Sequence, residues 1–319
     1  MENPTLPLEM MREILLRLPV RSVLRFKCVC KTWFSLISEP HFGISHYQLD
    51  AAPSYRFLLP FFGPYFESVD ADPHLAQHFS AVHLPIPPFR YMYERTRKQI
   101  LGSCRGLILF YYHVGQFIDL ILGNPSTGIY KGFPNFGIPN SFLKDITSRF
   151  LYGFGYDAST EDYLLILIPC PLYIYPDGEP RKTHVFSFKT HSWNLYDTNV
   201  LYWDMGIQFR SGSLLNGALH WNPYSGMNEI WVMKEYKVQS SWTKLIRIPI
   251  RYPLRITKDG GIFGISEISR GSLRLAKFND KGELVDSFVC NGDHVWYDLK
   301  YSSGLNKESL LSLPTVIGE

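Results

Sequence analysis

The stretch from residue 6 to residue 42 constrains the fold more than any other part of this chain. Its apolar residues recur at helical spacing in three runs, which predicts three short helices. Pro7 suits the first turn of a helix, Pro19 separates the first helix from the second, and Pro40 ends the third. Helices this short cannot cover so many large apolar side chains by packing on one another. The stretch therefore predicts either a partner protein or packing on the rest of the same chain.

The order of residues in this stretch favours the partner. The series reads Leu6-Pro7, Glu13-Ile14-Leu15, Leu18-Pro19-Val20, Ser22, Leu24-Arg25-Phe26-Lys27, Val29-Cys30-Lys31, Trp33, Leu36-Ile37, Pro40 and Phe42. It resembles the F-box over its whole length. The resemblance implies a module that binds the Skp-type adaptor of a cullin-based ubiquitin ligase. The adaptor-binding side chains that it implies are Leu6, Pro7, Ile14, Leu15, Leu18, Pro19, Val20, Leu24, Val29, Cys30 and Trp33. We expect residues from about Ala52 onward to be dispensable for this binding.

Composition sets the class of the protein and its compartment. A chain of 319 residues that is 45% hydrophobic can hold the helical module and one large domain. A net charge of +3 argues against a dedicated nucleic-acid binder. We find no basic leader followed by an apolar run, and no run of ~18 apolar residues, so no membrane association is expected. Five scattered cysteines predict no disulfide framework, which suits the cytoplasm or the nucleus.

From about Tyr55 onward the sequence pattern is typical of an all-β domain. Aromatic and β-branched runs of five to eight residues alternate with turn formers. The predicted strands cover residues 56–61, 106–112, 117–122, 163–168, 184–188, 213–215, 218–221, 229–233, 262–265, 273–278 and 284–290. Residues 70–88 are predicted to be an irregular surface connection.

A weak internal repeat runs through this region. Four times an apolar run meets a polar turn and then a second apolar residue, in residues 120–130, 185–193, 230–242 and 275–285. Each is predicted to be the outer hairpin of one structural unit. Trp193 and Trp242 are separated by about the 40 to 50 residues of a four-stranded propeller blade. A β-propeller is therefore the preferred fold, and a β-sandwich is the alternative.

Several phrases of the β-region carry a second resemblance. They are residues 100–107, 123–128, 153–157 with 162–163, 185–188 with 192–193, 216–221 and 230–236. They resemble the F-box-associated, kelch-like domain of plant F-box proteins, which implies a β-propeller that captures a protein for ubiquitination. The join between Trp221 and Trp231 is shorter than that family's pattern by roughly a blade, so the propeller is expected to be shortened to about five blades or to be incomplete. The expected domains are an F-box at 1–45, a linker at 46–54 and the β-propeller at 55–319.

No motif in the sequence predicts catalysis, a metal site or a cofactor. Gly153-Phe154-Gly155 lacks the third glycine of a dinucleotide fingerprint and is interpreted as a tight turn between strands. The basic and aromatic residues 89–99 are interpreted as a solvated loop, and the acidic turns at 157–162 and 279–282 as hairpin turns. The sequence thus predicts a non-catalytic substrate receptor that binds the adaptor, through it a cullin, and an unknown target. The alternatives are an F-box protein with a non-ubiquitin role, one whose shortened β-domain binds no target, and a propeller enzyme.

Overall fold

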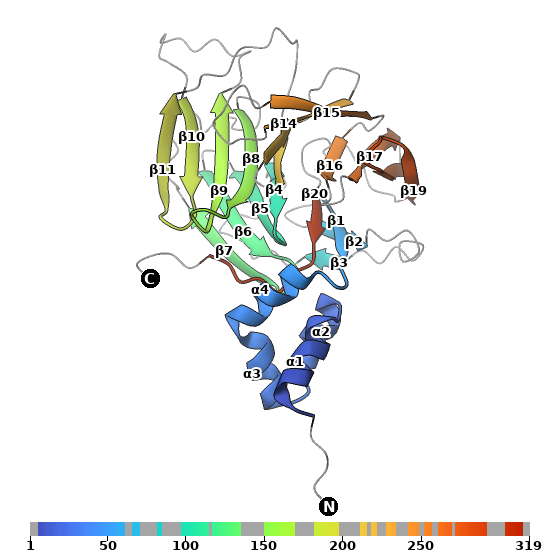
Figure 1. Ribbon diagram of the computed structural model, residues 1–319. Coiled ribbons are helices and arrows are strands. Elements are labelled where there is room, and N and C mark those ends of the chain that lie inside the picture. Colours follow the sequence, from blue (N-terminus) through green and yellow to red (C-terminus); the bar gives the residue numbers. More distant parts are fainter. Residues whose placement is uncertain are drawn as a thin grey trace, which may run out of the picture.

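A computed structural model describes most of the chain. The described residues are 6–60, 66–70, 82–84, 97–114, 117–134, 150–169, 182–197, 211–215, 218–221, 228–233, 242–248, 252–256, 261–269, 272–291 and 304–314. They form a helical module at the N-terminus and a β-domain, which lie at opposite ends of the view in Figure 1.

The helical module contains the three predicted helices and a fourth. The helices are α1 (Leu8–Leu16), α2 (Val20–Phe26), α3 (Lys31–Ser38) and α4 (Pro40–Leu49). Pro40 does follow the end of α3, but it also opens α4, because proline at the first helical position needs no N–H partner. The sequence did not predict α4 because its apolar residues show little helical periodicity and Gly43 interrupts them. Its last turn lies within the expected linker at 46–54.

The described strands form five four-stranded units, which we number as blades. Blade 1 consists of β20 (Gly304–Lys307), β1 (Tyr55–Pro60), β2 (Phe66–Asp70) and β3 (Val82–Leu84). Blade 2 consists of β4 (Arg97–Cys104), β5 (Leu107–Val114), β6 (Phe117–Asn124) and β7 (Ile129–Pro134). Blade 3 consists of β8 (Phe150–Asp157), β9 (Asp162–Pro169), β10 (Lys182–Ser187) and β11 (Ser192–Asp197). Blade 4 consists of β12 (Ser211–Leu215), β13 (Ala218–Trp221), β14 (Asn228–Met233) and β15 (Trp242–Ile248). Blade 5 consists of β16 (Tyr252–Ile256), β17 (Ile262–Ser269), β18 (Ser272–Phe278) and β19 (Leu284–Asn291).

The first strands of the five blades form a ring. In the order β20, β4, β8, β12 and β16, each contacts the next, and β16 contacts β20. Blade 1 combines the two ends of the β-domain, because β20 pairs with β1 from Tyr55↔Lys307 to Leu58↔Gly304. Figure 1 shows these two strands side by side. The ring is thereby closed by a strand from the C-terminal end of the chain.

Two inner strands approach closely enough to share hydrogen bonds. β8 and β12 pair in parallel through Gly153↔Gly212, which joins blades 3 and 4 into one eight-stranded sheet. Gly153-Phe154-Gly155 therefore lies within β8, and its interpretation as a turn was wrong.

Both faces of β5 are buried, because blade 2 packs between blade 1 and blade 3. In β5, Leu107, Leu109 and Tyr111 join a core with blade 3, whereas Ile108 and Phe110 join a core with blade 1. Alternate side chains of a strand point to opposite faces, so a core on each face buries both sets of side chains. This explains why the strand is a continuous apolar run in the sequence.

The structure confirms most of the predicted strands and all four predicted hairpins. Residues 120–130, 185–193 and 275–285 span the turns between the third and fourth strands of blades 2, 3 and 5. For the stretch 230–242, β14 and β15 pair antiparallel in blade 4, while 234–241 lie outside the described residues. The stretch 70–88 is not wholly irregular, because Val82–Leu84 forms β3, while 71–81 and 85–88 lie outside the described residues. Trp221 pairs with Trp231, so β13 and β14 are neighbours within blade 4. That a blade has been lost relative to the family stays a prediction.

Candidate functional site

The structure places the implied adaptor-binding residues at three depths. Leu6, Pro7, Ile14, Pro19, Val29 and Cys30 are exposed; Leu18, Leu24 and Trp33 are half-buried; Leu15 and Val20 are buried. The exposed members can contact a partner directly. The buried members pack inside the module and support that surface.

Helix α1 is apolar on two sides. Leu15 and Leu16 face the core of the module, whereas Met10 and Ile14, one turn apart, are 54% and 51% exposed. Leu8 is also exposed just before them. Since large apolar side chains cost free energy when hydrated, this is the apolar excess that the sequence predicts.

A second exposed apolar group lies where α3 begins. Val29 is 60% exposed and Phe34, one turn into α3, is 57% exposed. Sequence reasoning missed Leu8, Met10 and Phe34 as candidates for the docking surface. The signal was the spacing of Met10 from Ile14 and of Phe34 from Cys30, since residues four apart share one side of a helix.

A small core holds these two groups in place. Leu15, Leu16, Val23, Leu36, Ile37 and Phe42 form it. Trp33 packs against it with its ring centroid 5.1 Å from that of Phe26, and its Nε1 donates to Sδ of Met11 at 3.3 Å. The half-buried Trp33 therefore links α1, α2 and α3.

One side chain that packs against this core comes from a distant part of the chain. Leu310 packs on the module, and a Cβ on Gly43 would lie 2.9 Å from the Leu310 carbonyl oxygen. Figure 1 shows residues 308–314 passing between α4 and the blades. We call residues 304–314 the C-terminal segment. That residues beyond Ala52 are dispensable for adaptor binding stays a prediction, but removing them would remove Leu310 from this core.

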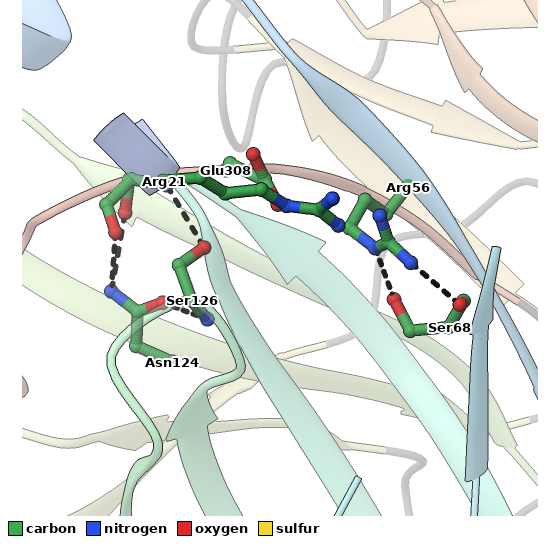
Figure 2. A network of polar contacts seen from close by, with 7 residues as sticks. Arg21, Arg56, Ser68, Asn124, Ser126 and Glu308 are labelled. Carbon is green, nitrogen blue, oxygen red and sulfur yellow. Dashed lines mark hydrogen bonds and ion pairs between the residues drawn. The ribbon is translucent and has the colours of Figure 1, made fainter. Parts of the chain in front are cut away.

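Polar contacts join the helical module to the β-domain. Nε of Arg21 in α2 donates to Oε1 of Glu308 at 3.0 Å, as Figure 2 shows from close by. Lys307 pairs with Asp50 at the end of α4. The Arg105 guanidinium, in the β4–β5 turn, lies 5.6 Å from the ring centroid of Tyr47 in α4. These contacts link α2 and α4 with the end of β20, so the module is attached at more than one point.

The two acidic turns that the sequence singled out have a structural role in the β-domain. Asp157 Oδ1 accepts hydrogen bonds from Oγ and N of Ser159 at 2.7 and 2.9 Å, which lower the pKa of the carboxyl. Oδ1 of Asn279 likewise accepts from the backbone of Lys281 and Glu283. Both acidic turns are thus hairpin turns, as predicted. Of the basic and aromatic stretch 89–99, only residues 97–99, at the start of β4, belong to the described chain.

The described residues contain no group of three or more His, Cys, Asp or Glu side chains arranged to hold a metal ion. Within the same residues, no helix has the length and apolar character that crossing a bilayer requires. Cys28 and Cys30 are exposed free thiols and Cys104 is a buried one.

Comparison with known proteins accounts for both parts of the chain. Residues 4–45 match the F-box domain, and residues 83–229 match the F-box associated beta propeller domain. The F-box/kelch-repeat protein At3g23880 of Arabidopsis thaliana is 30% identical, over 97% of this chain and 79% of that protein. The chain belongs to the plant F-box proteins with an F-box-associated β-propeller domain.

Other relatives of this F-box protein are longer. The Arabidopsis thaliana proteins named Putative F-box protein At3g16210 and F-box protein At1g47340 are each 28% identical, over 72% and 69% of this chain. The alignments cover 56% and 48% of those two proteins, so the chain spans about half their length. Among solved structures, TolB from Acinetobacter baumannii aligns with 84% of this chain and 72% of its own, with a TM-score of 0.40 at 9% identity.

Proposed function

We propose that this F-box protein is the substrate receptor of a Skp-cullin-F-box ubiquitin ligase. The F-box binds a Skp-type adaptor and through it a cullin, the β-propeller holds a target protein, and no residue of the chain makes or breaks a covalent bond. We place this activity in the cytoplasm or the nucleus.

The exposed apolar surface of the F-box is the observation that carries the proposal. Ile14 and Met10 of α1 and Val29 and Phe34 near α3 remain hydrated although the core beneath them is well packed. A partner that covers them gains the free energy of burying apolar area, about 25 cal/mol per Å². The family's adaptor-binding role supports a Skp-type protein as that partner.

Attachment of the F-box to the propeller supplies a mechanism based on proximity. Because Leu310, Glu308 and Lys307 contact the helical module, a target held on the propeller keeps a limited range of positions relative to the adaptor. A lysine of the target then meets the ubiquitin-carrying enzyme at a raised effective concentration.

Adaptor binding is tested by Ile14→Asp, with Ile129→Asp as the matched control. Both isoleucines are about half exposed, at 51% and 54%, but Ile129 lies at the start of β7 in blade 2. A carboxylate buried without a partner in an interface costs several kcal/mol, so Ile14→Asp is expected to abolish co-purification with a co-expressed Skp-type adaptor. Ile129→Asp is expected to leave it unchanged. Adaptor binding retained by Ile14→Asp would refute this assignment.

A second variant tests the same interface in the same assay. Replacing Leu18 by Ala and Pro19 by Ser removes apolar contact at the join of α1 and α2 without adding charge, and it is expected to abolish co-purification with the adaptor. Circular dichroism must show unchanged helix content for the loss to count as an interface effect.

Target binding is tested independently of the adaptor. With the proteasome inhibited, proteins that co-purify with both the unchanged chain and Ile14→Asp are candidate targets, because only adaptor binding is lost in the variant. Ubiquitination of such a target is expected to require Ile14. A candidate that is ubiquitinated equally with the Ile14→Asp variant would contradict the receptor role.

A further inference from the structure

A cavity of about 380 Å³ lies at the junction between the F-box and the propeller. Its lining comes from segments far apart in the sequence: Arg21 and Arg25 from α2, Arg56 from β1, Ser126 from the β6–β7 turn, Asn306 from β20, and Glu308. Figure 2 shows most of these polar side chains grouped around the C-terminal segment. The volume falls in the range of small-molecule sites in proteins.

The lining carries three guanidinium groups and one carboxylate. Arg56 is buried at 8% exposure, and its Nε and Nη2 donate to Oγ and O of Ser68. Arg21 donates to Oε1 of Glu308, while Arg25 is exposed at the edge of the cavity. Guanidinium groups are the side chains best suited to hold phosphate, because their donors match its oxygens in pairs.

Two acceptor atoms of the lining lack a hydrogen-bond donor among the described residues. Within the described part of the chain, no donor reaches Oδ1 of Asn306 or Oε2 of Glu308, although these residues are only 2% and 6% exposed. A buried acceptor without a hydrogen-bond donor costs free energy, so a bound molecule that donates hydrogen bonds to these two atoms would be stabilised here. The cavity thus offers donors for an anion and acceptors for hydroxyl groups.

We propose that this cavity binds a small phosphate monoester that also carries hydroxyl groups. A phosphate monoester bears about −1.5 to −2 charges near pH 7, which balances the excess of guanidinium groups in the lining. The hydroxyl groups donate to Asn306 and Glu308. Because the ligand touches α2 on one side and blade 1 on the other, it also fastens the F-box to the propeller. This inference is independent of the adaptor and of the target.

The test uses the whole chain and glycerol 3-phosphate as the probe. Isothermal titration calorimetry at constant ionic strength is expected to show that glycerol 3-phosphate binds about tenfold more tightly than inorganic phosphate, because its hydroxyl groups add hydrogen bonds. Glycerol alone is expected not to bind. Binding to the folded state alone also raises the thermal unfolding midpoint.

Arg25→Gln is the diagnostic variant and Arg17→Gln is its matched control. Both arginines are exposed on the F-box, but Arg17 pairs with Glu13 on α1 and does not line the cavity. Arg25→Gln is expected to weaken glycerol 3-phosphate binding about tenfold, and Arg17→Gln to leave it unchanged. Equal loss in both variants would show non-specific attraction to positive charge and overturn the proposal.

Two further outcomes would overturn it as well. One is the absence of calorimetric binding of both inorganic phosphate and glycerol 3-phosphate at millimolar concentration. The other is a phosphoserine peptide that binds as tightly as glycerol 3-phosphate with the same dependence on Arg25, which would assign the cavity to a protein ligand.

Discussion

Asn124 joins the C-terminal segment to blade 2, and its replacement by alanine tests how much that join contributes to stability. Its side chain is fully buried at the end of β6. Nδ2 donates to the backbone oxygens of Ser309 at 3.0 Å and Leu311 at 2.9 Å, and Oδ1 accepts from the N–H of Ser126 at 2.9 Å. Figure 2 shows Asn124 between the β6–β7 turn and the segment.

The expected loss follows from these three hydrogen bonds. A typical intramolecular hydrogen bond contributes about 1 kcal/mol, and a buried group left without a partner costs about 1–3 kcal/mol. Asn124→Ala is therefore expected to lower the free energy of unfolding by about 3 kcal/mol. Asn124→Asp is expected to lower it further, because a carboxylate oxygen would then face two carbonyl oxygens.

Asn279→Ala is the matched control for this measurement. Oδ1 of Asn279 also accepts two backbone N–H groups, at 3.0 and 2.9 Å, but both lie in its own hairpin turn and are exposed. Water can replace these partners, so the expected loss is at most about 1 kcal/mol. Urea unfolding gives the two free energies, and hydrogen exchange locates the effect.

Faster exchange in Asn124→Ala is expected to concentrate in residues 304–314 and in the helical module that Leu310 supports. If Asn124→Ala and Asn279→Ala destabilise the protein equally, or if exchange in the C-terminal segment is unchanged, this account of the join is wrong.

Three further predictions concern the β-domain. Gly106 and Gly128 both have positive φ, +80 and +71, but a Cβ on Gly106 would overlap Ser309 of the C-terminal segment, whereas a Cβ on Gly128 has nothing within 4 Å. Gly128→Ala is therefore expected to cost the ~1–2 kcal/mol of backbone strain alone, and Gly106→Ala well over that, as measured by urea unfolding. Burial lowers the pKa of His184, so the unfolded state binds the proton more readily, and the free energy of unfolding is expected to fall as the pH drops below about 6.5. His184→Asn is expected to lose this pH dependence, and an unchanged dependence would exclude His184 as its cause. Residues 217–233 are expected to exchange amide hydrogens faster than residues 163–168, since the join there is short; equal protection would mean that blade 4 packs as firmly as blade 3.

Local patterns in the sequence predicted the elements that local physics determines. Helical periodicity marked α1 to α3, and each polar turn between apolar runs marked an outer hairpin, because turn chemistry and alternation act over a few residues. The strand β20, with the sequence Gly304-Leu305-Asn306-Lys307, carries no such pattern. Its place is fixed by pairing with β1 at the opposite end of the β-domain, which no local signal records.

The candidate docking surface was predicted only in part for a related reason. The resemblance identified which residues belong to the F-box, but burial depends on how α1, α3 and α4 pack against one another and against Leu310. Leu15 and Ile14 are adjacent in sequence and equally apolar, yet one is buried and the other is half exposed. The cavity between Arg25 and Asn306 had no sequence signal at all, because its lining is assembled by the fold.

The closure of blade 1 by β20 also has a consequence for synthesis of the protein. The F-box leaves the ribosome before the propeller, and neither Leu310, which packs against its core, nor β20, which closes the ring, exists at that point. The nascent chain therefore exposes an F-box core that Leu310 does not yet cover and an unpaired edge of β1, and such surfaces attract chaperones and other strands. Both parts acquire their last contacts only after β20 and Leu310 have left the ribosome.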